Sequence, residues 1–213
     1  MKKLGIAMIF ALTLAAALAA QTAPVDSKGA MALQFTMDGL GTFGIGGTPV
    51  DLPNGAYTGT NWAATGYGLG AKYFVIDKLS VGAGLYFSSD SVTLSGSANV
   101  RKTGYFGLRP FATYTLAKKG PVALTAGGYL SMGFYNEDDP ANTTKLAYSV
   151  FGGGATFGAE CFVMNGVSLG ADYRFGANFY KMAETNTVTN AVTTNSYSRI
   201  GTGSASVFLS FYL

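Results

Sequence analysis

The segment GYGLGAKYFVIDKLSVGAGLYF, residues 66–87, alternates glycines with bulky apolar residues on both sides of a short polar interruption. Successive side chains of a β-strand point to opposite faces, so this alternation predicts two strands joined by a turn at Asp77 and Lys78. Glycine normally weakens a strand, and its concentration on one face therefore needs a structural reason. The glycines expected on that face are Gly66, Gly68, Gly70, Gly82 and Gly84.

The same two-residue period recurs along the rest of the chain. Each further segment sets apolar side chains against a face of Gly, Ser, Thr and a few charged residues, and Asn165-Gly166 is a strong hairpin signal between two of them. Together with the opening hairpin, these segments give eight predicted strands. The additional strands are expected at 31–43, 104–116, 122–134, 151–163, 167–176 and in a final segment that ends at Leu213.

The connections between the predicted strands alternate in length. Three are short, at 76–78, 117–121 and 164–166, and four are long and polar, at 44–62, 89–103, 136–148 and 177–199. An even number of alternating strands, with short turns at one rim and long loops at the other, is the signature of a transmembrane β-barrel. The fold prediction is all-β: an eight-stranded antiparallel up-and-down transmembrane β-barrel with three periplasmic turns and four extracellular loops.

A soluble eight-stranded barrel of the lipocalin type is the main alternative, because it alternates apolar and polar faces in the same way. Only 12% of the residues are charged, about half the usual fraction of a soluble domain. The charges gather in turns and loops instead of along the polar faces, which favours the membrane barrel. Aromatic residues near predicted strand ends suit two interfacial girdles: Tyr73, Tyr114, Tyr173 and Tyr212 at one rim, and Phe87, Tyr105, Phe106 and Phe134 at the other.

The N-terminus has the pattern of a secretory signal peptide. Lys2 and Lys3 precede an uncharged apolar run, and the small residues of 17–20 supply a cleavage site. We expect residues 1–20 to be removed and residues 21–213 to form a single barrel domain. Without the two lysines, 12 basic residues stand against 11 acidic ones, so the sequence gives no basic footprint for nucleic acid.

The sequence lacks residues on which most catalytic mechanisms depend. There is no histidine, which removes Ser-His and Cys-His nucleophilic pairs, and Cys161, the single cysteine, is expected to face lipid as a small apolar side chain. GLGTFG at 39–44 matches a dinucleotide motif, but no helical pattern follows it. The acidic run 137–139 is expected in a solvated loop, with a weak divalent-cation site as the alternative. We therefore predict no enzymatic activity, no cofactor and no metal site.

The polar faces of the predicted strands carry three acids and three bases. A barrel of eight strands has an interior that side chains just fill, so these charges must pair or pay a desolvation cost. Balanced signs favour a packed ion-pair network over a selective pore, in which one sign would dominate. The predicted network in the lumen comprises Asp38, Lys72, Arg109, Glu160, Asp172 and Arg174. The inward glycines leave room for large groups such as Tyr86, Tyr129 and Arg109.

The chain resembles the small eight-stranded outer-membrane barrels of the OmpX, OmpW and OmpA-transmembrane-domain type. The segments that carry the resemblance are residues 66–87, FGLRPFATY, GGGATFG and the terminal SASVFLSFYL. It implies residence in the outer membrane of a Gram-negative-type bacterium, contact with lipopolysaccharide and insertion by the barrel-assembly machinery. That machinery usually reads a final aromatic residue, whereas this chain ends in Phe211, Tyr212 and Leu213.

Two functional hypotheses follow. The first is a non-enzymatic, monomeric outer-membrane barrel with a filled lumen, which supports envelope integrity and presents loops for adhesion or for recognition of an extracellular ligand or host surface. The second is a narrow channel or OmpW-like carrier for small or hydrophobic solutes, suggested by the inward glycines. An enzyme acting on lipid A or peptides is disfavoured, because such outer-membrane enzymes use histidine.

Overall fold

The computed structural model describes residues 26–38, 67–93, 100–139 and 143–213, and these form a closed antiparallel barrel of eight strands. Each strand pairs with its sequence neighbours, and β1 pairs with β8 to close the ring. This confirms the predicted fold and strand number. The strands are β1 (Met31–Asp38), β2 (Tyr67–Ile76), β3 (Leu79–Thr93), β4 (Val100–Lys119), β5 (Val122–Asp139), β6 (Thr144–Met164), β7 (Val167–Asn186) and β8 (Val192–Tyr212).

Three tight turns join the strands at one end, which we call the turn end. They lie at residues 77–78, 120–121 and 165–166, as predicted. Each turn has one residue with a positive φ: Lys78 at 68°, Gly120 at 57° and Gly166 at 74°. Glycine adopts this conformation without the steric cost of a Cβ, which explains its use in two of the three turns. The C-terminus lies at the same end, because β8 ends at Tyr212.

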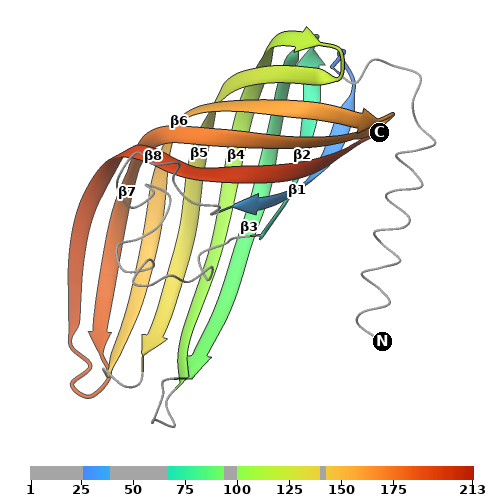
Figure 1. Ribbon diagram of the computed structural model, residues 1–213. Helices are drawn as coiled ribbons and strands as arrows, with labels where there is room; N and C mark the ends of the chain where they lie inside the picture. The colour runs from blue at the N-terminus through green and yellow to red at the C-terminus, as the bar shows by residue number, and fades with distance from the viewer. Residues whose placement is uncertain (1–25, 39–66, 94–99, 140–142) are drawn as a thin grey trace.

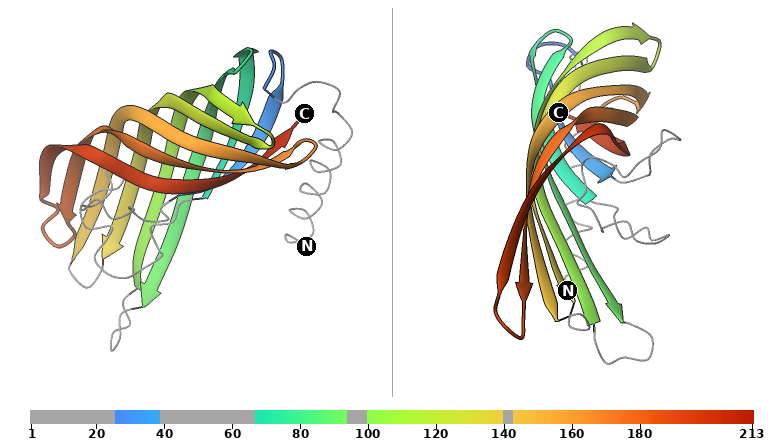
Figure 2. Two further views of the ribbon diagram at one scale, coloured as in Figure 1. Left: turned by 45° about the horizontal axis from the view of Figure 1, so that its top comes forward. Right: turned by 90° about the vertical axis from the view of Figure 1, so that its left-hand side faces the viewer.

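The opposite end, which we call the long end, extends well past the first two strands. β1 has 8 residues and β2 has 10, whereas β4 to β8 have 18 to 21 each. In Figure 1 the long strands continue toward the lower left, beyond the ends of β1 and β2. The side view in Figure 2 shows them as a strongly curved sheet. The described strands therefore form a complete ring near the turn end and a curved sheet of β3–β8 beyond it.

The predicted loop lengths at the long end are wrong for three connections. Most of 89–103, 136–148 and 177–199 is strand, and β7 and β8 are joined by only residues 187–191. The segment VTTNSYSR at 192–199 shows why, since Thr, Tyr and Val favour strands even in a polar context. The segment 44–62 lies outside the described residues.

Side chains alternate between the two faces of the sheet as the sequence predicts. In β2 and β3, Leu69 and Leu85 are 48% and 45% exposed on the outer face, while Lys72 and Tyr86 are buried on the inner face. Among the described residues, no helix is long and apolar enough to span a membrane. The polar residues thus line the interior of the ring and the apolar residues cover its exterior.

Candidate functional site: the interior of the barrel

Near the turn end, the interior of the barrel holds a buried ion pair. The Lys72 Nζ atom from β2 lies 2.9 Å from Oε2 and 3.0 Å from Oε1 of Glu160 in β6, and both side chains are only 6% exposed. Ser168 and Tyr212 donate further hydrogen bonds to Oε1, the Tyr212 bond at 2.7 Å. The carboxylate therefore accepts from three side chains, which offsets the cost of removing two charges from water.

Aromatic rings enclose this ion pair. The Lys72 ammonium lies 4.9 Å from the centre of the Tyr212 ring and 5.9 Å from the centres of Phe74 and Phe208. Phe74 and Tyr212 also belong to a buried apolar cluster with Ala32, against which Phe162 packs. The cation–π contacts stabilise the buried ammonium group. The exclusion of water strengthens its attraction to the carboxylate.

The first described residues form a strap across the turn end. The Lys118 Nζ atom lies 3.0 Å from Oδ1 of Asp26, and the Lys28 backbone N–H donates to Oδ1 of Asp77 at 2.8 Å. The backbone N–H of Lys78 donates to the carbonyl of Asp26 at 2.9 Å. The strap thereby ties the entry to β1 onto the β2–β3 turn and the end of β4.

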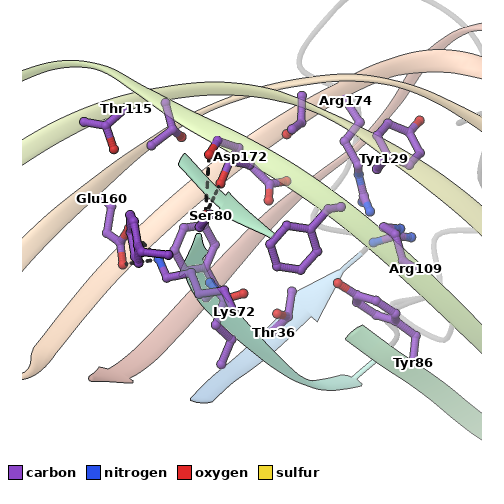
Figure 3. Close-up of a pocket in the computed structure, with 17 residues that line it drawn as sticks. Thr36, Lys72, Ser80, Tyr86, Arg109, Thr115, Tyr129, Glu160, Asp172 and Arg174 are labelled. Carbon is purple, nitrogen blue, oxygen red and sulfur yellow. Dashed lines mark hydrogen bonds and ion pairs between the residues drawn. The ribbon is translucent and has the colours of Figure 1, made fainter. Parts of the chain in front are cut away.

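A second charged cluster lies further from the turn end and combines arginines with tyrosines. The Arg109 guanidinium stacks 4.2 Å from the centre of the Tyr86 ring and lies 5.9 Å from that of Tyr129. The Arg174 guanidinium approaches the same Tyr129 ring at 6.0 Å. Figure 3 shows the two arginines converging beside Tyr129, with Asp172 on the same wall. Arginine suits this position because its planar, weakly hydrated group stacks on aromatic faces.

Hydroxyl groups line the space between the two charged clusters. Ser80 and Thr113 share a hydrogen bond of 2.8 Å, and four more threonines border the same cavity. Its volume is about 70 Å³, enough for a few ordered waters but well below the roughly 300 Å³ of a small-molecule site. The threonines are Thr36, Thr115, Thr125 and Thr156.

Several inner glycines make room for aromatic rings. A Cβ on Gly68 would lie 2.7 Å from the Tyr86 ring, and one on Gly84 would lie 2.8 Å from it. A Cβ on Gly82 would strike the Phe111 ring and the Ala71 carbonyl, whereas one on Gly70 would strike mainly the Ala83 carbonyl, at 2.8 Å. The glycines of the opening hairpin thus lie under large side chains or against the neighbouring strand.

The structure divides five of the six predicted network residues between the two clusters. Lys72 and Glu160 form the first cluster, and Arg109, Asp172 and Arg174 line the same cavity further along the barrel. The backbone of Asp38 pairs with Ser206, but its side chain lies outside the described part of the structure, as does Gly66.

Sequence reasoning missed several interior residues. Tyr105 and Tyr212 were expected in the exterior girdles, but both lie on the inner face: Tyr212 is 1% exposed, and the Tyr105 ring lies 2.9 Å from the position of a Cβ on Gly133. The predicted network in the lumen also omits Ser168, whose hydroxyl donates to Glu160. Tyr105 and Tyr212 are the sequence neighbours of Phe106 and Phe211. Strict alternation along the strands would therefore have placed both tyrosines on the inner face.

The acidic run 137–139 is strand rather than loop. Glu137 is buried on the inner face and accepts a hydrogen bond of 3.0 Å from Tyr135. Asp138 faces outward and pairs with Lys145 at 3.2 Å. Within the described residues, no group of three or more His, Cys, Asp or Glu side chains could hold a metal ion.

The exterior is a continuous band of exposed apolar side chains. Leu124, Leu130, Phe157 and Leu169 are each 50 to 60% exposed, and an aromatic row runs across consecutive register partners. Such a surface is unstable in water but suits lipid, and a closed ring leaves no unpaired backbone edge to face lipid. The chain is a membrane-spanning β-barrel. Its aromatic row consists of Tyr67, Phe87, Phe106 and Phe134.

Comparisons with known proteins give likenesses at the level of the fold. A major outer membrane protein from Thermus thermophilus is 13% identical with a TM-score of 0.49, and the match covers 86% of this chain and 99% of that protein. Neisserial surface protein A is 18% identical with a TM-score of 0.41, and the match covers 85% of this chain and 96% of that protein. No protein-family model and no curated protein matches the sequence.

Proposed function

We propose that this chain is a non-enzymatic outer-membrane β-barrel whose interior is closed by packed side chains. The observation that carries the proposal is the combination of an apolar exterior with an interior filled by charges of both signs. Its expected roles are support of envelope integrity and presentation of the long end at the cell surface, where an extracellular ligand or a host surface would contact it.

The filled interior supports a closed barrel rather than a channel or carrier. Lys72 and Glu160 form a direct ion pair among aromatic side chains, and the adjoining cavity of about 70 Å³ is well below the roughly 300 Å³ of a small-molecule site. A conducting pore needs a continuous water path, and a selective one usually carries a dominant charge. Here Lys72, the base of the first cluster, meets an acid, and Arg109 of the second cluster is stacked on the Tyr86 ring, while Arg174 lies 6.0 Å from the centre of the Tyr129 ring.

Conductance across a planar bilayer tests this proposal. Refolded wild-type protein is expected to give no reproducible single-channel steps at either voltage polarity. The variant Glu160→Ala removes the acceptor of the first cluster and serves as the positive comparison, in which single-channel steps are expected. The variant Asp138→Asn at the exterior serves as the matched control, in which none are expected. Stable wild-type steps that Arg109→Ala abolishes would contradict the closed barrel and favour the channel.

Insertion by the barrel-assembly machinery is proposed from the end of β8. Tyr212 faces the interior, whereas Phe211 alternates to the opposite face, where it is 3% exposed and packs against Phe35 at a ring distance of 5.9 Å. We propose that Phe211 takes the place of the final aromatic residue that this machinery usually reads. Reduced outer-membrane levels of a Phe211→Ala variant, with unchanged refolding into detergent, would support this assignment, and unchanged levels would contradict it.

A further inference from the structure

The outer face changes abruptly from apolar to polar in the part of the barrel that approaches the long end. On each strand from β3 to β8, an exposed large apolar side chain is followed, two residues further toward the long end, by a small or polar residue. The steps are Phe87 to Ser89, Phe106 to Gly104, Phe134 to Asn136, Phe151 to Ser149, Phe179 to Lys181, and Ile200 to Ser198. This line marks where the membrane core gives way to lipid headgroups.

Lys181 is the single charged residue of the described chain at that step. It is exposed, and its cross-strand partners are Ser149 in β6 and Ser196 in β8. No ion pair joins Lys181 to any described residue. The nearest outward ion pair, between Lys145 and Asp138, involves a different lysine further along β6. The ammonium group of Lys181 is therefore available to an anion from outside the barrel.

A hollow lies beside this lysine on the outer surface of β6, β7 and β8. Its volume is about 520 Å³ and it is open to the surroundings. Ser149, Lys181 and Ser196 are register partners along its polar side, and Phe151 and Phe179, 56% and 61% exposed, lie in the next row together with Ser198.

We propose that this hollow binds one phosphorylated glycolipid of the outer leaflet, with Lys181 and the serine hydroxyls on the phosphate and Phe151 and Phe179 against an acyl chain. The proposal rests on the outer-membrane residence proposed above. Charge complementarity selects this occupant through Lys181, because the outward positions of β6–β8 beyond the step carry, among the described residues, no acid, whereas Lys145 further along β6 is already paired with Asp138 of β5. The adjoining apolar band selects a lipid over free phosphate, which would gain nothing from the phenylalanines.

Native mass spectrometry of the refolded protein in detergent tests the site, with diphosphorylated lipid A as the probe. Wild-type protein is expected to retain one lipid, and Lys181→Gln to weaken its binding about fivefold, the factor expected for one lysine at an anionic lipid surface. Lys181→Arg keeps the charge and should retain binding. Lys102→Gln is the matched control: it removes the same charge from an exposed outward position of β4 outside the hollow, and should change affinity less than about twofold.

Two further measurements separate the outcomes. Dephosphorylated lipid A and inorganic phosphate should each bind at least about fivefold more weakly than the diphosphorylated lipid. Equal losses in the Lys181→Gln and Lys102→Gln variants, or equal binding of the dephosphorylated lipid, would overturn the site. Gel mobility of unboiled and boiled samples reads barrel formation separately: a heat-dependent shift without selective lipid binding rejects this site alone, whereas no shift in wild-type protein rejects the membrane barrel.

Discussion

The two ends of the barrel fill their interior in different ways. Near the turn end, where all eight strands close the ring, Glu160 accepts hydrogen bonds from Lys72, Ser168 and Tyr212. Toward the long end, the inner face carries mainly paired tyrosines, one of which donates to the buried Glu137: the ring centres of Tyr135 and Tyr148 lie 5.6 Å apart in an edge contact, and two further tyrosines stack at 4.8 Å.

This difference predicts unequal tolerance to substitution. A buried charge depends on each of its partners, since the removal of one leaves the others desolvated and unpaired. Aromatic contacts depend mainly on area and shape, and a pair contributes about 0.5–1.5 kcal/mol beyond burial. The turn end should therefore dominate the stability of the barrel and the long end should accept more sequence change.

The largest effect is expected from Glu160→Ala. The substitution leaves the Lys72 ammonium buried without its acid, and should lower the free energy of unfolding by about 3–5 kcal/mol. Urea unfolding of the refolded protein, followed by gel mobility, measures the change. The double variant Lys72→Met, Glu160→Leu should recover most of the loss, because it removes both charges. A single variant as stable as wild type would show that the ion pair contributes little.

A smaller effect is expected from Gly154→Ala in β6. A Cβ there would strike the Phe175 carbonyl and the Gly176 backbone of β7, neither of which can move independently of the sheet. The expected loss is about 1–3 kcal/mol. Gly104→Ala in β4 is the matched control, since a Cβ at Gly104 meets nothing within 4 Å. Equal stability of the two variants in the same urea titration would contradict the account of close strand packing.

The smallest effect is expected from Asp138→Asn at the long end. Its ion pair with Lys145 is exposed, the two side chains being 45% and 58% accessible. Exposed pairs contribute at most about 1 kcal/mol, so the midpoint of urea unfolding should hardly move. A loss comparable with that of Glu160→Ala would mean that the long end is as strictly specified as the turn end.

Much of the fold follows from the sequence because alternation is a local property. The opening hairpin, the three short turns and the closed ring all rest on a two-residue period that 66–87 shows most clearly. The ends of the strands were harder to predict, since polar segments such as 192–199 form strands through Thr and Tyr. Polarity alone cannot distinguish a strand that extends beyond the membrane from a loop.

The interior was only partly predictable for a different reason. Alternation places Lys72 and Glu160 inside, but their meeting depends on how far the strands are staggered around the ring, a property of the whole barrel. The residues lie 88 positions apart in the chain. The role of Ser168 depends on the same stagger, which no local pattern contains.

A nitroxide scan along β7 tests the central claim, that this barrel has lipid outside and packed side chains inside. Spin labels would be attached to single cysteines at 168–179, in a Cys161→Ser background reconstituted in bilayers, and collision rates with oxygen and with a water-soluble nickel complex would be measured. The account predicts a two-residue period: high oxygen access at outward positions such as Leu169, Phe175 and Phe179, and little access by either reagent at inward positions such as Ser168 and Arg174. Absence of that period, or free access of the nickel complex to the inward positions, would contradict it.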